Sequence, residues 1–140
     1  MYEYRKLLEC FAAERTAKVA SPEDIASLKD TIAIENNPRA KVSELVEANY
    51  ALHTGIARLA QNQPIFDQLN RTLEYVHRLD VLSTRRNTEW LGHGHSEILL
   101  ALQAHDVKGA HKAMAEHIDR SRERMLGVLF RGEMPNLQRS

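Results

Sequence analysis

Apolar residues recur every three or four positions along most of this chain, a spacing typical of helices that bury one face. The first predicted helix covers about residues 2–19. Ser21 can cap the second helix, and Pro22 then occupies its first turn, where a missing N–H costs nothing. The second helix runs out near Asn36-Asn37-Pro38, which is turn chemistry.

Four more helices follow with the same periodicity. Ser43 is predicted to cap the third helix, and Pro64 opens the fourth after a polar break. The fifth helix begins near His95, and Asp106 is predicted to cap the sixth. Six helices and almost no strand are therefore expected.

The expected fold class is all-α, an antiparallel bundle of about six helices with an internal cavity for a ligand or metal. Residues 1–130 are assigned to this single domain. The last ten residues, 131–140, have no apolar pattern and are expected to form a frayed tail.

The amino-acid composition limits the classes of function that this chain can have. The 140 residues suit one domain, and 43% hydrophobic with 27% charged residues is typical of a soluble globular protein. Nineteen basic residues balance nineteen acidic ones, so the chain as a whole offers no strongly cationic surface to nucleic acid or to an anionic membrane. A single cysteine, Cys10, cannot form an internal disulfide and is interpreted as a buried structural thiol. Without a signal core or membrane-length apolar run, a cytoplasmic location is expected.

Three histidines lie on the apolar faces of three different predicted helices: His53, His95 and His117. A buried imidazole needs a polar partner. Asn49 precedes His53 by four residues, so both lie on one helix face, one turn apart. Three imidazoles and one amide oxygen would suit a divalent transition metal such as zinc or nickel, and would leave positions open for water or a carboxylate.

A simpler interpretation stays open at this point. A histidine on an apolar face is usually a core residue hydrogen-bonded to a neighbour, and three histidines can be three such cases. Glu97 and Glu116 adjoin two of these histidines in sequence but project elsewhere. The other four histidines are interpreted as surface or edge residues: His77, His93, His105 and His111.

Two arginines, Arg5 and Arg78, are candidates for binding an effector, because a guanidinium can hold a carboxylate with two hydrogen bonds. Periodicity alone favours a solvated surface charge for each.

The run from His95 through Ala101-Leu102 and Asp106 to His117 resembles the end of the effector-binding FCD domain of GntR-type bacterial transcription regulators, the FadR subfamily. In that family the third helix carries Asp-x-x-x-His and, nine residues later, an asparagine. Here the same spacing joins Asn49, His53 and Asn62.

The start of the chain is also similar to this family. Arg5-Lys6-Leu7-Leu8-Glu9 resembles the first helix of the domain, and the Ser21–Leu28 segment resembles the second. The resemblance covers about residues 2–125.

The resemblance implies a metal that helps to bind a small organic-acid effector inside the bundle. Arg5 and Arg78 are the candidates to hold the far end of that effector. Four positions would hold the metal: Asn49, His53, His95 and His117. Asn49 stands where the family usually has aspartate, which removes one negative charge from the site.

The resemblance further implies a homodimer that acts on DNA through a separate N-terminal winged-helix domain, which is expected to be absent from this sequence. A sensor domain is thus expected rather than an enzyme. Two alternatives remain: a metal-dependent enzyme on a helical bundle, and a metal-free interaction module with core histidines.

Overall fold

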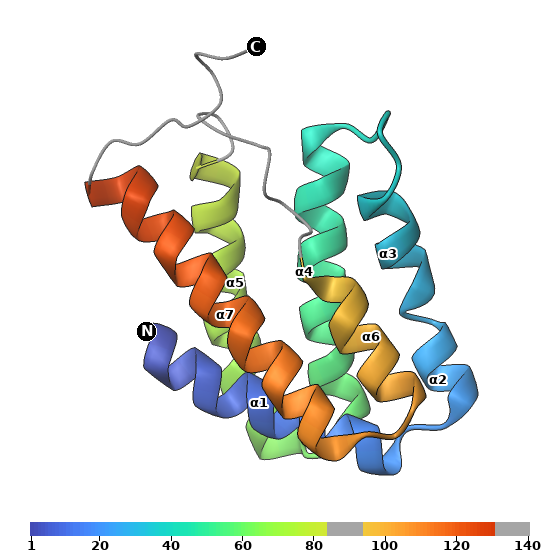
Figure 1. The fold of residues 1–140 in the computed structure, drawn as a ribbon. Helices are drawn as coiled ribbons and strands as arrows, with labels where there is room; N and C mark the ends of the chain where they lie inside the picture. Colours follow the sequence, from blue (N-terminus) through green and yellow to red (C-terminus); the bar gives the residue numbers. More distant parts are fainter. Residues whose placement is uncertain (84–93, 131–140) are drawn as a thin grey trace.

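The structure is a computed structural model that describes residues 1–83 and 94–130. Within these ranges the chain is helical and has no strand, which confirms the all-α bundle (Figure 1). Seven helices are present there: α1 (Tyr2–Val19), α2 (Pro22–Ala26), α3 (Lys29–Glu35), α4 (Val42–Leu59), α5 (Gln63–Ser83), α6 (His95–Gln103) and α7 (Val107–Phe130).

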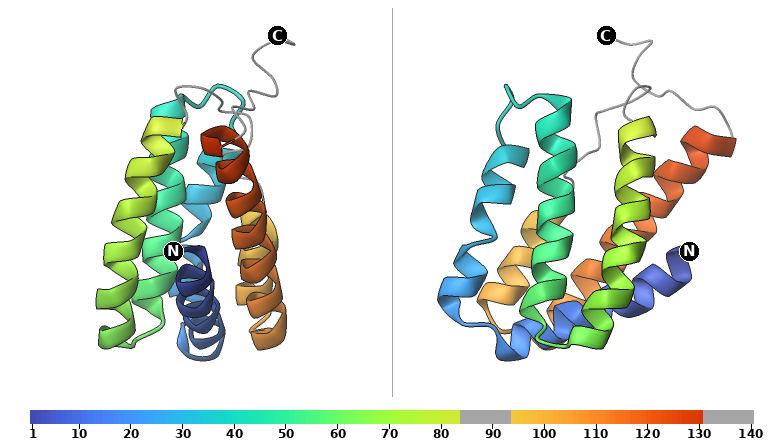
Figure 2. Two further views of the ribbon diagram at one scale, coloured as in Figure 1. Left: turned by 90° about the vertical axis from the view of Figure 1, so that its left-hand side faces the viewer. Right: turned by 180° about the vertical axis from the view of Figure 1, so that it is seen from behind.

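Helix α1 lies between two helix pairs, α4–α5 on one side and α6–α7 on the other (Figure 2). Short α2 and α3 flank α4 and α6 at the edge of the bundle. Ala12, Ala13 and Ala17 on α1 are fully buried, and their small side chains let neighbouring helices approach closely. A helix with neighbours on two sides also buries some of its polar side chains, and Arg5 and Glu9 lie in the interior.

The core is made of apolar side chains from each of these seven helices. Removing these side chains from water supplies most of the free energy that favours folding. The largest aliphatic residues with 0–1% exposure are Ile25, Leu52, Ile56, Leu69, Ile98, Leu102, Met114 and Ile118.

Two of the expected helix starts are confirmed. Ser21 Oγ accepts a hydrogen bond from the Asp24 backbone N–H at 3.1 Å, and Pro22 is the first residue of α2. Asp106 Oδ1 accepts from the Gly109 N–H at 3.0 Å at the start of α7.

The second expected helix is divided into two, which gives seven helices rather than six. The break comes between α2 and α3, where the Ser27 hydroxyl donates to the Asp24 carbonyl at 2.5 Å. A serine that bonds to the preceding turn competes with the regular helical pattern and favours a bend.

The expected cap at Ser43 is wrong. Helix α4 begins at Val42, so Ser43 lies inside its first turn, and the N-cap position belongs to Lys41, whose backbone N–H donates to Glu44 Oε2 at 2.7 Å. Helix α5 begins at Gln63, one residue before Pro64, and Asn62 caps it. Oδ1 of Asn62 accepts a hydrogen bond from the Ile65 N–H at 3.1 Å.

The expected tail at residues 131–140 lies outside the described residues. None of the helices in the described part of the chain has both the length and the apolar character needed to cross a membrane.

Candidate metal centre

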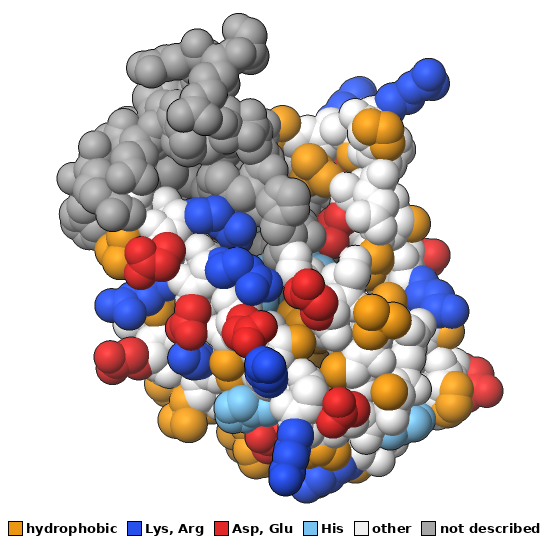
Figure 3. Space-filling model, in the orientation of Figure 1, with side chains coloured by type: hydrophobic (Ala, Val, Ile, Leu, Met, Phe, Trp, Pro, Cys, Tyr) orange, Lys and Arg blue, Asp and Glu red, His pale blue; other side chains and the backbone are white. Residues whose placement is uncertain are grey.

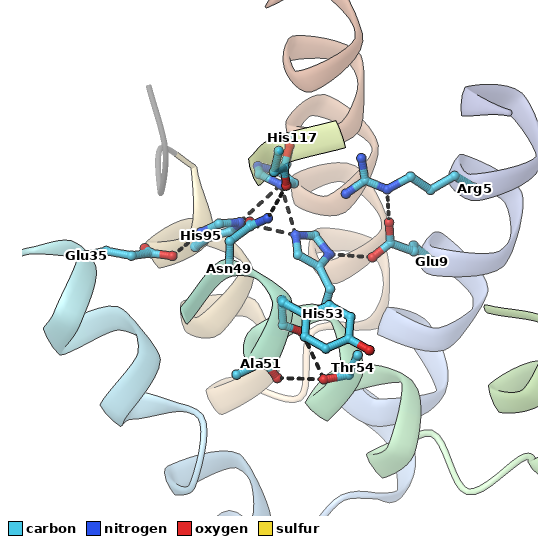
Figure 4. A network of polar contacts seen from close by, with 11 residues as sticks. Arg5, Glu9, Glu35, Asn49, Ala51, His53, Thr54, His95 and His117 are labelled. Carbon is cyan, nitrogen blue, oxygen red and sulfur yellow. Dashed lines mark hydrogen bonds and ion pairs between the residues drawn. The ribbon is translucent and has the colours of Figure 1, made fainter. Parts of the chain in front are cut away.

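Three helices bring three imidazoles to one point inside the bundle. His53 lies in the middle of α4, His95 is the first residue of α6, and His117 lies in the middle of α7. Their exposed fractions are 2%, 0% and 2%. We call these three residues the histidine cluster. The expected inward placement of all three is confirmed (Figure 4).

The Nε2 atoms of the histidine cluster face one another. The Nε2–Nε2 distances are 3.2 Å from His53 to His95, 3.1 Å from His53 to His117, and 3.1 Å from His95 to His117. Two nitrogens that each lie about 2.1 Å from one ion, at angles between octahedral and tetrahedral, are about 3.0 to 3.4 Å apart. The residues present therefore fit a transition metal bound by three imidazoles.

A carboxylate stands behind each of two of these rings. Glu9 Oε1 bonds to Nδ1 of His53, and Glu35 Oε1 bonds to Nδ1 of His95. An ionised carboxylate only accepts, so where Glu9 and Glu35 are ionised the ring proton lies on Nδ1 and the Nε2 lone pair faces the cluster. Two lone pairs that face each other cannot form a hydrogen bond, whereas a cation between them satisfies both.

The pKa values of the two carboxyl groups are shifted in opposite directions. Burial raises the pKa of Glu9, but Arg5 and His53 outweigh that effect and lower it to about 2. Glu9 is therefore ionised at neutral pH. Burial raises the pKa of Glu35 to about 8. A positive charge at the Nε2 atoms would favour the ionised form of Glu35, because an opposite charge nearby stabilises a carboxylate.

Asn49 lies one turn before His53 on α4 and is half-buried. Its Nδ2 donates to Asp80 Oδ2 at 3.1 Å, so the amide oxygen is the end that remains for a metal. Asp80 is 7% exposed, and burial raises the pKa of its carboxyl group. The role of Asn49 as a ligand stays a prediction.

A small pocket of about 10 Å³, enough for about one water molecule, adjoins His53 between α1, α4 and α5. We call it the side pocket. Its lining residues are Arg5, Asn49, Tyr50, His53, Leu73, Val76, His77 and Asp80.

The structure separates the two candidate arginines. Arg5 lines the side pocket, is 2% exposed, and donates from Nε to Glu9 Oε2 at 2.5 Å, so a surface charge is the wrong interpretation for this residue. Arg78 is exposed on α5, with its guanidinium carbon 5.9 Å from the Tyr75 ring centre, and is not among the residues that line the side pocket.

The start of α6 depends on a glycine. Gly94, the N-cap residue before His95, has φ of 88°, a left-handed conformation that L side chains rarely adopt. A Cβ at this position would lie 2.2 Å from Nη2 of Arg120. Gly94 thus allows the chain to enter α6 with His95 directed inward.

Comparison with protein families matches residues 1–120 to the FCD domain. The chain belongs to the FCD domain family. It is 27% identical over 138 residues to the "Uxu operon transcriptional regulator" of Escherichia coli (strain K12), an alignment that covers 90% of this chain and 52% of the relative. The chain thus spans about half the length of this curated relative. The resemblance stated from sequence is confirmed, and the family is one of regulator domains rather than enzymes.

The remaining polar candidates that the structure describes lie where they were expected. His77 is half-buried, and His105 and His111 are exposed, whereas His93 lies outside the described residues. Glu97 and Glu116 are exposed and take no part in the histidine cluster.

Sequence reasoning missed three carboxylates of the centre, namely Glu9, Glu35 and Asp80. Asp80 continues the buried stripe of Leu69, Leu73 and Val76 on α5, so a charge on an apolar face was a usable signal. Glu9 follows Arg5 by one helical turn, a spacing that favours an ion pair but does not indicate that the pair is buried. No sequence signal indicates Glu35, whose contact depends on the packing of α3 against α6.

Proposed function

We propose that this FCD domain is a ligand-sensing module that holds a divalent transition metal, such as zinc or nickel, on the histidine cluster. Asn49 would add an oxygen donor. The observation that carries the proposal is the convergence of three buried Nε2 atoms at 3.1 to 3.2 Å. When bound, the metal would supply a buried positive charge with open positions for an anionic oxygen.

The ligand is proposed to be a small organic acid. Arg5 lines the side pocket beside His53, and Glu9 bonds only its Nε in the described network, so the remaining guanidinium N–H groups can hold a carboxylate. A pocket of about 10 Å³ is too small for an organic acid, so binding requires side chains or helices to shift. A ligand that forces such a shift is suited to control another domain. Arg78 remains a predicted contact for the far end of the ligand, although its exposed position supports this less well than the position of Arg5.

The proposed output is transcription regulation, supported by the name of the bacterial relative. DNA binding is assigned to a separate winged-helix domain outside residues 1–130. The FCD domain itself is expected to form a homodimer, because regulators that bind two DNA half-sites are dimers. The formal net charge is zero, and on the face in Figure 3 basic and acidic side chains are interspersed rather than gathered in a cationic patch. The helical domain by itself therefore offers little attraction for DNA.

The metal assignment is tested by elemental analysis of protein purified without chelators or immobilised nickel. His53→Ala, His95→Ala and His117→Ala should each reduce bound divalent metal sharply, because each removes one of three donors. His111→Ala is the matched control, since this histidine is exposed on the same helix as His117.

Equal metal content in all four variants would contradict the assignment. A wild-type protein that binds no zinc or nickel at all would instead favour core histidines that serve only packing.

A further inference from the structure

Two buried carboxylates lie on the far side of their histidines from the point where the Nε2 atoms meet (Figure 4). The side chains of Glu9 and Glu35 are 1% and 3% exposed. Burying a carboxylate is costly unless it is paired. Glu9 has two partners, the guanidinium of Arg5 and the ring of His53. For Glu35, the partner found within the described residues is His95.

The position of Glu35 in its helix is unfavourable by local criteria. It is the last residue of α3, where the aligned peptide dipoles present partial negative charge, and the last turn has no basic residue. Asn36, the next residue, is exposed, so the solvent lies close to the end of α3 where Glu35 stands. Glu35 instead bonds inward to His95, sixty residues later in the sequence. Helix stability does not explain this placement.

We propose that Glu35 is a positioning residue for the metal, and that it holds the Nδ1–H of His95 so that Nε2 points at the shared centre. Glu9 does the same for His53. This inference rests on the proposed function, because it assigns a role within the metal centre. The ligand helices α4 and α6 are thereby supported by carboxylates from α1 and α3, neither of which supplies a ligand of its own to the histidine cluster.

The physical reason lies in the freedom of an imidazole ring. A histidine side chain can turn its ring over and can place its proton on either nitrogen. A carboxylate behind Nδ1 selects one ring orientation and one tautomer, and its negative charge makes Nε2 a better electron donor. Carboxylates in this position also offset the charge of a divalent ion that is otherwise held by neutral imidazole and amide groups.

The test measures zinc affinity, by competition with a chromophoric chelator, in the wild type and in Glu35→Gln and Glu35→Ala. Loss of an outer carboxylate should weaken zinc binding by about 10- to 100-fold in Glu35→Ala. Glu35→Gln should weaken it less, because an amide oxygen can still accept the Nδ1–H. Glu97→Gln is the control, since its side chain is 67% exposed and lies two residues after His95 on α6.

A second readout is the Nδ1–H proton of His95, followed by NMR in zinc-loaded protein. A slowly exchanging, downfield signal should be present in the wild type and in Glu97→Gln, and lost to exchange in Glu35→Ala. A role limited to holding α3 against α6 would lower thermal stability while leaving the zinc affinity of folded protein and this signal unchanged, and that result would overturn the inference.

The two proposals fail in different ways. If Glu35→Ala does not fold, Glu35→Gln decides: weaker zinc binding supports the positioning role, and wild-type affinity overturns it. Zinc binding by the wild type and equally by both Glu35 variants overturns this inference alone. Absence of zinc binding by the wild type overturns the proposed metal centre and this inference with it.

Discussion

Asn49 is half-buried on α4, and its amide oxygen is a predicted metal donor. Its Nδ2 is used by Asp80, so an Asn49→Asp change would add negative charge for a metal and also bring two carboxylates together. Zinc binding should tighten, because Coulomb attraction is strong in a poorly solvated interior. The metal-free variant should lose about 1 to 3 kcal/mol of unfolding free energy, the usual cost of a buried group left without its partner.

Zinc titration and urea denaturation of Asn49→Asp measure these two effects. The double variant Asn49→Asp with Asp80→Asn is the control, because it restores one N–H donor and one carboxylate with their positions exchanged. Unchanged or weaker zinc binding in the single variant would mean that Asn49 is not a ligand.

Cys10 is the free thiol of the chain, and it lies buried on α1. Burial raises its pKa to about 11, assisted by nearby Glu9. Only the thiolate reacts with iodoacetamide, so the alkylation rate of folded protein should keep rising about tenfold per pH unit from pH 8 to pH 10. In urea the rate should level off near the ordinary cysteine pKa of about 8.5. A plateau near pH 8.5 in folded protein would contradict the raised pKa.

Helix α2 has only five residues, so the cap of its first turn contributes a large share of its stability. Ser21 supplies the side-chain acceptor of its capping box, so Ser21→Ala should lower the free energy of unfolding by about 0.5 to 2 kcal/mol, measured by urea denaturation at fixed metal content. Ser43→Ala is the matched control, because Ser43 is exposed inside the first turn of α4 rather than at its cap. That change should stay within about 0.5 kcal/mol. Equal losses in both variants would contradict the assigned caps.

Features that depend on local sequence were predictable at this scale. Apolar periodicity located α1, α4, α5, α6 and α7, and it also placed the histidine cluster on buried faces, because both follow from the helical repeat. The break between α2 and α3 was missed, since it depends on a local competition at Ser27 that leaves the apolar pattern intact.

Features that depend on packing between distant segments were not predictable. The contact of Glu35 with His95 requires the end of α3 to meet the start of α6. The burial of Arg5 requires α1 to be enclosed between two helix pairs, whereas its periodicity suggested a surface charge. The positions of Glu35 and Arg5 beside the histidine cluster could therefore be identified only from the structure.

For the molecule as a whole, a metal that binds only the folded state should raise stability by mass action. Zinc at 100 times its dissociation constant should add about 2.7 kcal/mol. For a chain of 140 residues this corresponds to a rise in Tm of about 10 °C, measured by differential scanning calorimetry. Removal of the metal by a chelator should reverse the rise, and His53→Ala should show almost none. A zinc-independent Tm in the wild type would contradict a metal centre in the folded domain.

The histidine cluster joins segments that the ribosome produces at different times. His53 precedes His95 by 42 residues, and His117 follows after 22 more. Helix α7, which carries His117, packs against α1, and Lys6 pairs with Asp119 at 2.9 Å. The three donors therefore meet only after the first and last described helices have docked. A nascent chain that has not yet released α7 offers an ion at most two imidazoles of the histidine cluster, so metal loading would mark the completion of this domain during synthesis.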